Sequence, residues 1–308
     1  MASKVSSKVS PLPLKTFHSS TSTTLSSLTF SRTWLAAVAK ENMEIASNGY
    51  YTNSSGAQVD VNKALKEAVK KSQHYHYTKE VLPPSPTDYA SQGTKMYVCY
   101  SLIIKAAIAL RKAGAEKVGV LNSADGFIPG GKFGTGCLSL EACICRGSLL
   151  WPCLDKFKDK ANIMYKINSE KFTDSPSSCA IYSPDVPLIR KDALEAQFLD
   201  EHEVCSFVSL PPPNAFALGS TEKVKSKLRE HLSRALFIFA ENGCTDIVLC
   251  SYGCGSRGHD PIMVAKIYND ILTNELKGFF KRVIFAINPK KKVEYKAFAT
   301  VFEENISL

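Results

Sequence analysis

The sequence predicts an α/β fold in which a mixed or parallel sheet is sandwiched between helices. Short apolar runs that suit buried strands alternate along the chain with longer segments whose apolar residues recur at helical spacing. Two of these runs lead into glycine-rich loops that precede helices. Because ligands of α/β proteins bind beyond the carboxyl ends of the strands, both loops are expected at one edge of the sheet.

The first predicted element is a helix that starts near Thr33, which can cap it, with Trp34, Leu35 and Val38 at helical spacing. The next elements follow in order: an amphipathic helix over residues 61–71, a proline-rich loop over 81–93, a strand over 95–100 and a helix over 101–113. A buried strand at about 118–121, the first glycine-rich loop and a helix over 139–154 complete this half.

The second half continues the alternation. Its predicted elements are a strand over residues 178–182, a loop over 183–187, a strand over 204–210, a helix over 221–242 and a strand over 246–250. The second glycine-rich loop, residues 251–261, precedes a helix over 262–276, and Pro261 suits the first turn of that helix. A strand over 282–287 and a helix over 294–304 close the chain.

The composition is that of an ordinary globular protein and argues against several functional classes. Of its 308 residues, 44% are hydrophobic and 22% are charged, with a formal net charge of +9. The basic residues are spread out and not interleaved with aromatic ones, so the sequence gives little support for a nucleic-acid-binding surface. The lysines of residues 289–292 are consistent with an ordinary solvated surface or with a patch that attracts a polyanion. The ten cysteines form no CxxC pair and lie mostly in apolar runs, which is typical of free intracellular thiols and unlike a zinc site.

The N-terminal segment differs from the rest. Residues 1–31 are rich in serine and threonine, and no acidic residue precedes Glu41. This composition fits either an organelle transit peptide or a disordered tail, so the folded domain is expected to span residues 32–308. No apolar run approaches the roughly 20 residues of a membrane span. The predicted location is cytoplasmic or nuclear, with an organelle as the alternative if the tail is a transit peptide.

The first glycine-rich loop has the sequence features of an anion-binding site. Its glycines allow a phosphate to approach the backbone, and the following helix N-terminus adds positive potential. Residues 126–132 match the first part of a P-loop, but Phe133 stands where Ser or Thr would hold Mg²⁺, and Pro129 lacks an N–H group, so an NTPase is disfavoured. Glu141 lies near the mouth of this loop and is the candidate acid–base residue.

The second glycine-rich loop strengthens the prediction of an anion-binding site. Gly253, Gly255 and Gly258 follow a strand and precede a helix, a spacing that alone would suit simple turn geometry equally well. Two such loops at one edge of a sheet could hold a diphosphate from both sides. Arg257 could add charge there, although it is equally consistent with a solvated loop arginine.

These blocks together resemble the microbial-type poly(ADP-ribose) glycohydrolase family, a relative of the macrodomains. The matching blocks are LNSADGFIPGGKF (121–133), LEA (140–142), CR (145–146), IYSPDVP (181–187), PPPN (211–214), GCGSRGHDP (253–261) and the opening helix (32–46). The resemblance implies a macrodomain-like fold with ADP-ribose or poly(ADP-ribose) as partner, ADP-ribosylated protein as a further candidate, and no cofactor or metal. The ligand-binding residues that it implies are Asn122, Gly130, Gly131, Lys132, Phe133, Gly253, Cys254, Gly255, Ser256 and Gly258.

The departures from the family pattern fall on polar positions of the site. Lys132 replaces the third glycine, Ile128 replaces an asparagine, and the family's QEE is Leu140-Glu141-Ala142. The second glutamate of that pair is the catalytic one in the family, and an alanine can neither protonate a leaving oxygen nor activate water. Two hypotheses follow: a catalytically impaired ADP-ribose-binding macrodomain, or an active glycohydrolase that uses Glu141. Asp125 is another candidate acid but suits a turn better, and a pocket for a different nucleotide is a third possibility.

Overall fold

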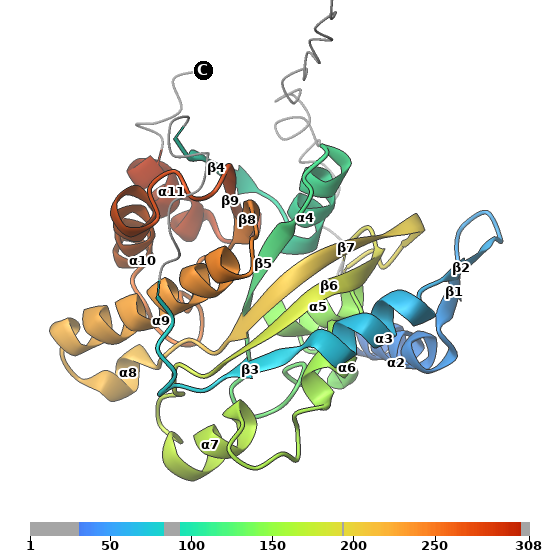
Figure 1. Ribbon diagram of the computed structural model, residues 1–308, viewed down its shortest axis with the longest axis horizontal. Coiled ribbons are helices and arrows are strands. Elements are labelled where there is room, and N and C mark those ends of the chain that lie inside the picture. The colour runs from blue at the N-terminus through green and yellow to red at the C-terminus, as the bar shows by residue number, and fades with distance from the viewer. Residues whose placement is uncertain (1–30, 83–92, 193, 303–308) are drawn as a thin grey trace, which may run out of the picture.

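The computed structural model describes residues 31–82, 93–192 and 194–302, which form one seven-stranded mixed sheet with helices on both sides (Figure 1). Listed from one edge to the other, the strands are β3 (Gln73–Tyr75), β6 (Ala180–Arg190), β7 (Phe198–Leu210), β5 (Val118–Ser123), β8 (Asp246–Leu249), β9 (Arg282–Ile287) and β4 (Lys95–Tyr100). Strands β7, β5, β8, β9 and β4 are parallel to one another, whereas β6 is antiparallel to β7 and β3 is antiparallel to β6.

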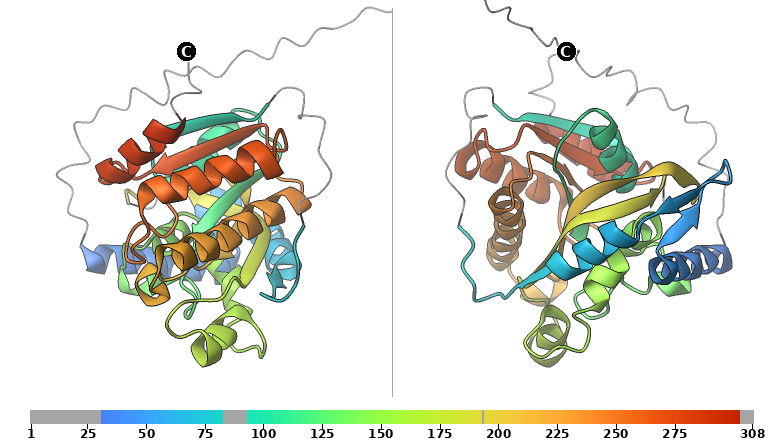
Figure 2. Two further views of the ribbon diagram at one scale, coloured as in Figure 1. Left: turned by 90° about the vertical axis from the view of Figure 1, so that its left-hand side faces the viewer. Right: turned by 45° about the vertical axis from the view of Figure 1, so that its right-hand side comes forward.

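Two helical layers cover the sheet (Figure 2). One contains α9 (Thr221–Glu241), α10 (Pro261–Asp270) and α11 (Lys292–Phe302), which pack against one another in that order. The other contains α2 (Arg32–Asn48), α3 (Asn62–Lys71), α4 (Ile103–Lys112), α5 (Leu140–Gly147) and α6 (Leu150–Asp155). The crossovers from β4 through α4 and from β7 through α9 run in opposite directions across the sheet, so right-handed connections place these helices on opposite faces.

The apolar residues that predicted the strands form the core. All residues of β8 and β9 are buried, as is expected for central parallel strands covered on both faces. Helix α9 buries Leu228, Leu232 and Phe239 at helical spacing. A smaller apolar cluster around Tyr51 and Ile189 joins α2, α3 and β6 to a hairpin of β1 (Tyr50–Thr52) and β2 (Gln58–Asp60).

Most predicted strands and helices are confirmed, and three predictions were wrong in detail. The helix expected over residues 139–154 is two helices, because Ser148 is extended and forms a β-bridge with Leu188. Residues 183–187 belong to β6 rather than to a loop, and the strand accommodates them with a register shift between Ser183 and Val186. Helix α2 is capped by the side chain of Ser31, not by Thr33.

Several elements had not been predicted. They are β1, β2, β3, the helices α7 (Met164–Lys171) and α8 (Ala215–Leu218), and the 3-10 turn η2 (Phe133–Thr135). The end of the helix predicted over residues 262–276 is a π-helical turn, η3 (Ile271–Glu275), which extends α10. Residues 1–30 of the predicted tail and 83–92 of the predicted proline-rich loop lie outside the described ranges. None of the helices within those ranges combines the length and apolar character that a membrane span requires.

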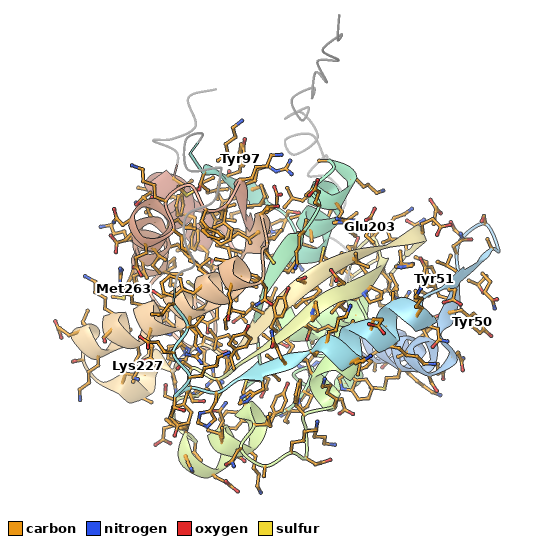
Figure 3. The ribbon with its side chains drawn as sticks, in the orientation of Figure 1. Tyr50, Tyr51, Tyr97, Glu203, Lys227 and Met263 are labelled. Carbon is orange, nitrogen blue, oxygen red and sulfur yellow. The ribbon has the colours of Figure 1, made fainter. Side chains whose placement is uncertain are left out.

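The sheet brings three loops together at the edge formed by the carboxyl ends of its parallel strands. We call residues 124–136 the first glycine loop, residues 211–214 the proline loop and residues 251–260 the second glycine loop; they follow β5, β7 and β8. Strand β5 pairs in parallel with β7 on one side and β8 on the other, which confirms that both glycine loops leave the same edge of the sheet. This edge lies on the side of the molecule where Lys227 and Met263 are found, away from Tyr50 and Tyr51 of the hairpin (Figure 3).

Candidate functional site

The carboxylate of Glu141 lies directly beneath the first glycine loop. Helix α5 begins at Leu140, so Glu141 is in its first turn, and its side chain is only 1% exposed. The Asn122 amide donates to Oε1 at 3.1 Å, and the backbone N–H of Asp125 donates to Oε2 at 2.8 Å. A Cβ atom on Gly131, whose φ is +52°, would lie 2.8 Å from Oε2. Glycine at this position therefore lets the loop close over the carboxylate.

Burial gives Glu141 an unusual protonation state. Loss of hydration raises the pKa of its carboxyl to about 8, although hydrogen bonds from Asp125, Asn122 and Gly130 act in the opposite direction. The carboxyl group is therefore largely protonated at neutral pH. The Oδ1 atom of Asn122 is buried without a partner in the described structure, and rotation of this amide would let Oδ1 accept the Glu141 proton.

We expect the buried carboxyl to make folding stability depend on pH. Folded Glu141 keeps its proton to about pH 8, whereas the unfolded chain releases it near 4.5, so between these values the folded state binds more protons and its stability falls as pH rises. Glu141→Gln cannot titrate. Urea unfolding across this range should show the wild type losing stability relative to Glu141→Gln as pH increases; parallel curves would contradict the raised pKa.

Asn122, predicted to bind ligand, is fully buried in β5. Its amide donates to Glu141 and to the Ser209 hydroxyl of β7, the latter at 3.0 Å. The Asn122 amide therefore faces the interior, where it fixes the position of Glu141. Asp125 is a turn former, as expected: its Oδ1 accepts the N–H groups of Phe127 at 2.8 Å and Ile128 at 3.1 Å.

Of the other predicted ligand-binding residues in the first glycine loop, Gly130 and Phe133 are buried and Lys132 is exposed. Phe133 is 3% exposed and packs near Trp151, so only its backbone can contact a ligand. Gly130 is buried beside these rings. Lys132 is exposed and has a left-handed backbone with φ 61°, which is strained for a residue with a side chain. Its ammonium group extends from a position where the family pattern has glycine.

Arg146 is a buried cation that secures the end of this loop. It is 0% exposed, and its guanidinium donates to the Cys137 carbonyl at 2.7 Å and the Phe133 carbonyl at 3.4 Å. The sequence drew attention to Arg146 only through the CR block, and did not indicate this anchoring role. Ala142, which follows Glu141, is 0% exposed and supplies only a methyl group.

The second glycine loop offers an accessible backbone. Gly255 and Ser256 are exposed, and no protein atom would lie within 4 Å of a Cβ on Gly255. Cys254 is half-buried with its thiol directed to the Tyr252 carbonyl, and burial raises its pKa. Gly258 lies against the ring of Phe216 in α8, which remains 78% exposed. Sequence reasoning missed Phe216; the only available signal was an aromatic residue two positions after the proline loop.

The proline loop joins the second glycine loop. The buried His259 ring packs against Gly253, and its Nε2 donates to the Pro213 carbonyl at 2.8 Å. The Ala215 N–H donates to the Arg257 carbonyl at 3.0 Å. These contacts make the two segments one structural unit beside the first glycine loop.

Comparison with known proteins agrees with this geometry. The family model of the microbial-type PARG catalytic domain matches residues 39–191. The crystal structure of poly(ADP-ribose) glycohydrolase from Thermomonospora curvata is 29% identical, with a TM-score of 0.80 over 87% of this chain and 99% of that chain. A glutamate-to-alanine mutant of that protein matches at 30% identity and a TM-score of 0.78, again over 87% and 99%. This chain belongs to the microbial-type poly(ADP-ribose) glycohydrolase family.

A more distant member of the family shares the fold. Poly(ADP-ribose) glycohydrolase from Deinococcus radiodurans, crystallised in complex with ADP-ribose, is 27% identical with a TM-score of 0.65 over 78% of this chain and 96% of that chain. A comparison with curated proteins finds no match. The macrodomain-like α/β fold and the family that the sequence predicted are thus both confirmed.

Proposed function

We propose that this member of the poly(ADP-ribose) glycohydrolase family binds ADP-ribose between its two glycine loops and is impaired in glycoside cleavage. Support for binding comes from the Deinococcus radiodurans relative, which was crystallised with ADP-ribose. The exposed backbone of Gly255 and Ser256 and the loop around Gly131 suit the two sides of a diphosphate. The exposed ring of Phe216 suits stacking against a flat base or ribose.

The impairment rests mainly on one observation: the Glu141 carboxylate is 1% exposed and holds the first glycine loop. The other two candidate positions supply no free acid either. Ala142 has a methyl group, and Asp125 is engaged in its own turn. Cleavage of an O-glycosidic bond needs a group that protonates the leaving oxygen and one that activates water. None of the three positions presents such a group at the surface.

One observation favours the alternative, an active glycohydrolase that releases ADP-ribose from poly(ADP-ribose) or from ADP-ribosylated targets. With its pKa raised to about 8, Glu141 holds a proton near neutral pH, as a general acid must. If ligand binding lifts the first glycine loop, this proton could reach the leaving oxygen. A turnover assay on poly(ADP-ribose) separates the two proposals.

We also propose an intracellular location for the protein. Most of the ten cysteines are buried in the core as free thiols, which fits a reducing intracellular compartment such as the cytoplasm or nucleus. ADP-ribosylated proteins are candidate partners there, in addition to free ADP-ribose and its polymer.

Calorimetry with ADP-ribose tests the binding site, and we expect a roughly micromolar Kd for the wild type. Gly255→Ala should weaken binding by about tenfold, since its methyl group would occupy the space where a diphosphate approaches the backbone. Its unfolding midpoint should not change. Gly134→Ala is the matched control for stability, because that methyl group would meet only Met43, at 3.6 Å.

Two results would count against the proposal. No heat from the wild type at millimolar ADP-ribose would end the binding proposal altogether. Wild-type affinity in Gly255→Ala would exclude the second glycine loop from the binding site.

A further inference from the structure

Helix α7 supports the first glycine loop through one buried side chain. Asn168 is 0% exposed. Its Nδ2 donates to the Gly126 carbonyl at 3.0 Å, and its Oδ1 accepts the Ser177 N–H at 2.9 Å and the Ser177 hydroxyl at 2.7 Å. The amide therefore joins the first glycine loop to residues 172–178, which we call the bridge segment.

Three parts of the chain meet at Gly126. A Cβ on this residue would lie 2.9 Å from Asn168 Nδ2, 3.2 Å from Pro176 Cβ and 3.2 Å from Pro211 Cβ. The first glycine loop, the bridge segment and the start of the proline loop are thus in direct contact. None of them can shift here without moving the other two.

The contacts continue from the bridge segment to the second glycine loop. The backbone N–H of Asn214 donates to Ser175 Oγ at 2.9 Å, and its side-chain amide donates to the Asp174 carbonyl at 3.0 Å. The proline loop is in turn bonded to the second glycine loop through Arg257 and His259. Hydrogen bonds and the short backbone segments between them therefore connect one glycine loop to the other through Asn168.

We infer that Asn168 is a positioning residue that sets the spacing between the two glycine loops. The inference rests on the proposed function, because a diphosphate gripped from both sides requires the loops at a fixed separation. Asn168 is buried and does not touch the ligand; it acts through Gly126 on one side and the bridge segment on the other. A small change in loop spacing would misalign contacts to a ligand that spans both loops.

Asn168→Asp tests this role with little change in size. One carboxylate oxygen can still accept from Ser177, but the other faces the Gly126 carbonyl and repels it. Ser177→Ala is a milder second variant that removes the hydrogen bond from the Ser177 hydroxyl to Asn168 Oδ1. Asn242→Asp is the control, because Asn242 bonds to Tyr75 and Ile238 at the far end of α9. Hydrogen exchange of both glycine loops is measured, together with affinities for ADP-ribose and AMP.

We expect Asn168→Asp to accelerate exchange about tenfold in both glycine loops, including the second, which Asn168 does not touch. ADP-ribose affinity should fall about tenfold, while that of AMP, too short to span both loops, should change less than about twofold. Ser177→Ala should act in the same direction, and Asn242→Asp should leave both loops unchanged. Wild-type exchange in the second loop, or equal losses for both ligands, would overturn the inference. If wild type binds no ADP-ribose, the proposed function fails, and the exchange data still decide whether Asn168 couples the loops.

Discussion

Ala142→Glu is expected to raise the release of ADP-ribose from poly(ADP-ribose) by about 10²–10⁴-fold, the usual contribution of a positioned general acid or base. The family resemblance places the catalytic glutamate at this position, next to Glu141. Position 142 lies in the first turn of α5, where the helix dipole favours a carboxylate. Adjacent helical side chains point about 100° apart, so a glutamate here can face a direction that Glu141 cannot. The rate of ADP-ribose release by both proteins is the measurement.

The control for this gain is Ala142→Gln, which has the same size and no titratable acid. Position 142 is 0% exposed, so both longer side chains must displace neighbours, and both variants should lose stability to a similar extent. Only the glutamate variant should gain activity. Equal rates for the glutamate and glutamine variants would show that acid–base chemistry is not what the site lacks. A wild type already as fast as Ala142→Glu would refute the impairment.

The placement of the glycine loops could be predicted because it depends on local pattern and one general rule. Apolar runs at about residues 118–121 and over 246–250 indicated two strands, and parallel strands end at the same edge of a sheet. The covering of Glu141 could not be predicted in the same way. It results from the close approach of Gly131 to the side chain of Glu141, ten residues later in the chain, and the spacing of apolar residues gives no sign of this contact.

The errors in the predicted fold have similar causes. Pro184 and Pro187 suggested a loop, but β3 pairs only with Ala180–Tyr182 of β6. Beyond this point, the described residues place no strand on that side of β6, only the single bridge from Ser148 to Leu188. Proline is tolerated at such an edge because no N–H is needed there. Helix α7 was missed because its buried face includes a polar residue, Asn168, whose three side-chain hydrogen bonds compensate for its burial.

Gly136→Ala is expected to destabilise the protein by about 2–4 kcal/mol, the combined effect of a left-handed backbone and steric overlap. Gly136 has φ 72°, and a Cβ there would lie 2.1 Å from the Arg32 carbonyl oxygen. The neighbour is backbone, so the overlap can be relieved only if the start of α2 moves away from the first glycine loop. The free energy of urea unfolding measures the loss.

The same substitution should also disturb the site, because α2 supports the helix that carries Glu141. The Asn42 amide of α2 donates to the carbonyls of Cys145 and Arg146 at the end of α5, at 3.0 and 2.8 Å. A displaced α2 would leave these carbonyls unsatisfied, so ADP-ribose affinity should fall with stability in Gly136→Ala. Gly134→Ala, two residues earlier, has no comparable overlap and should retain wild-type stability. If the two variants prove equally stable, α2 does not hold the first glycine loop.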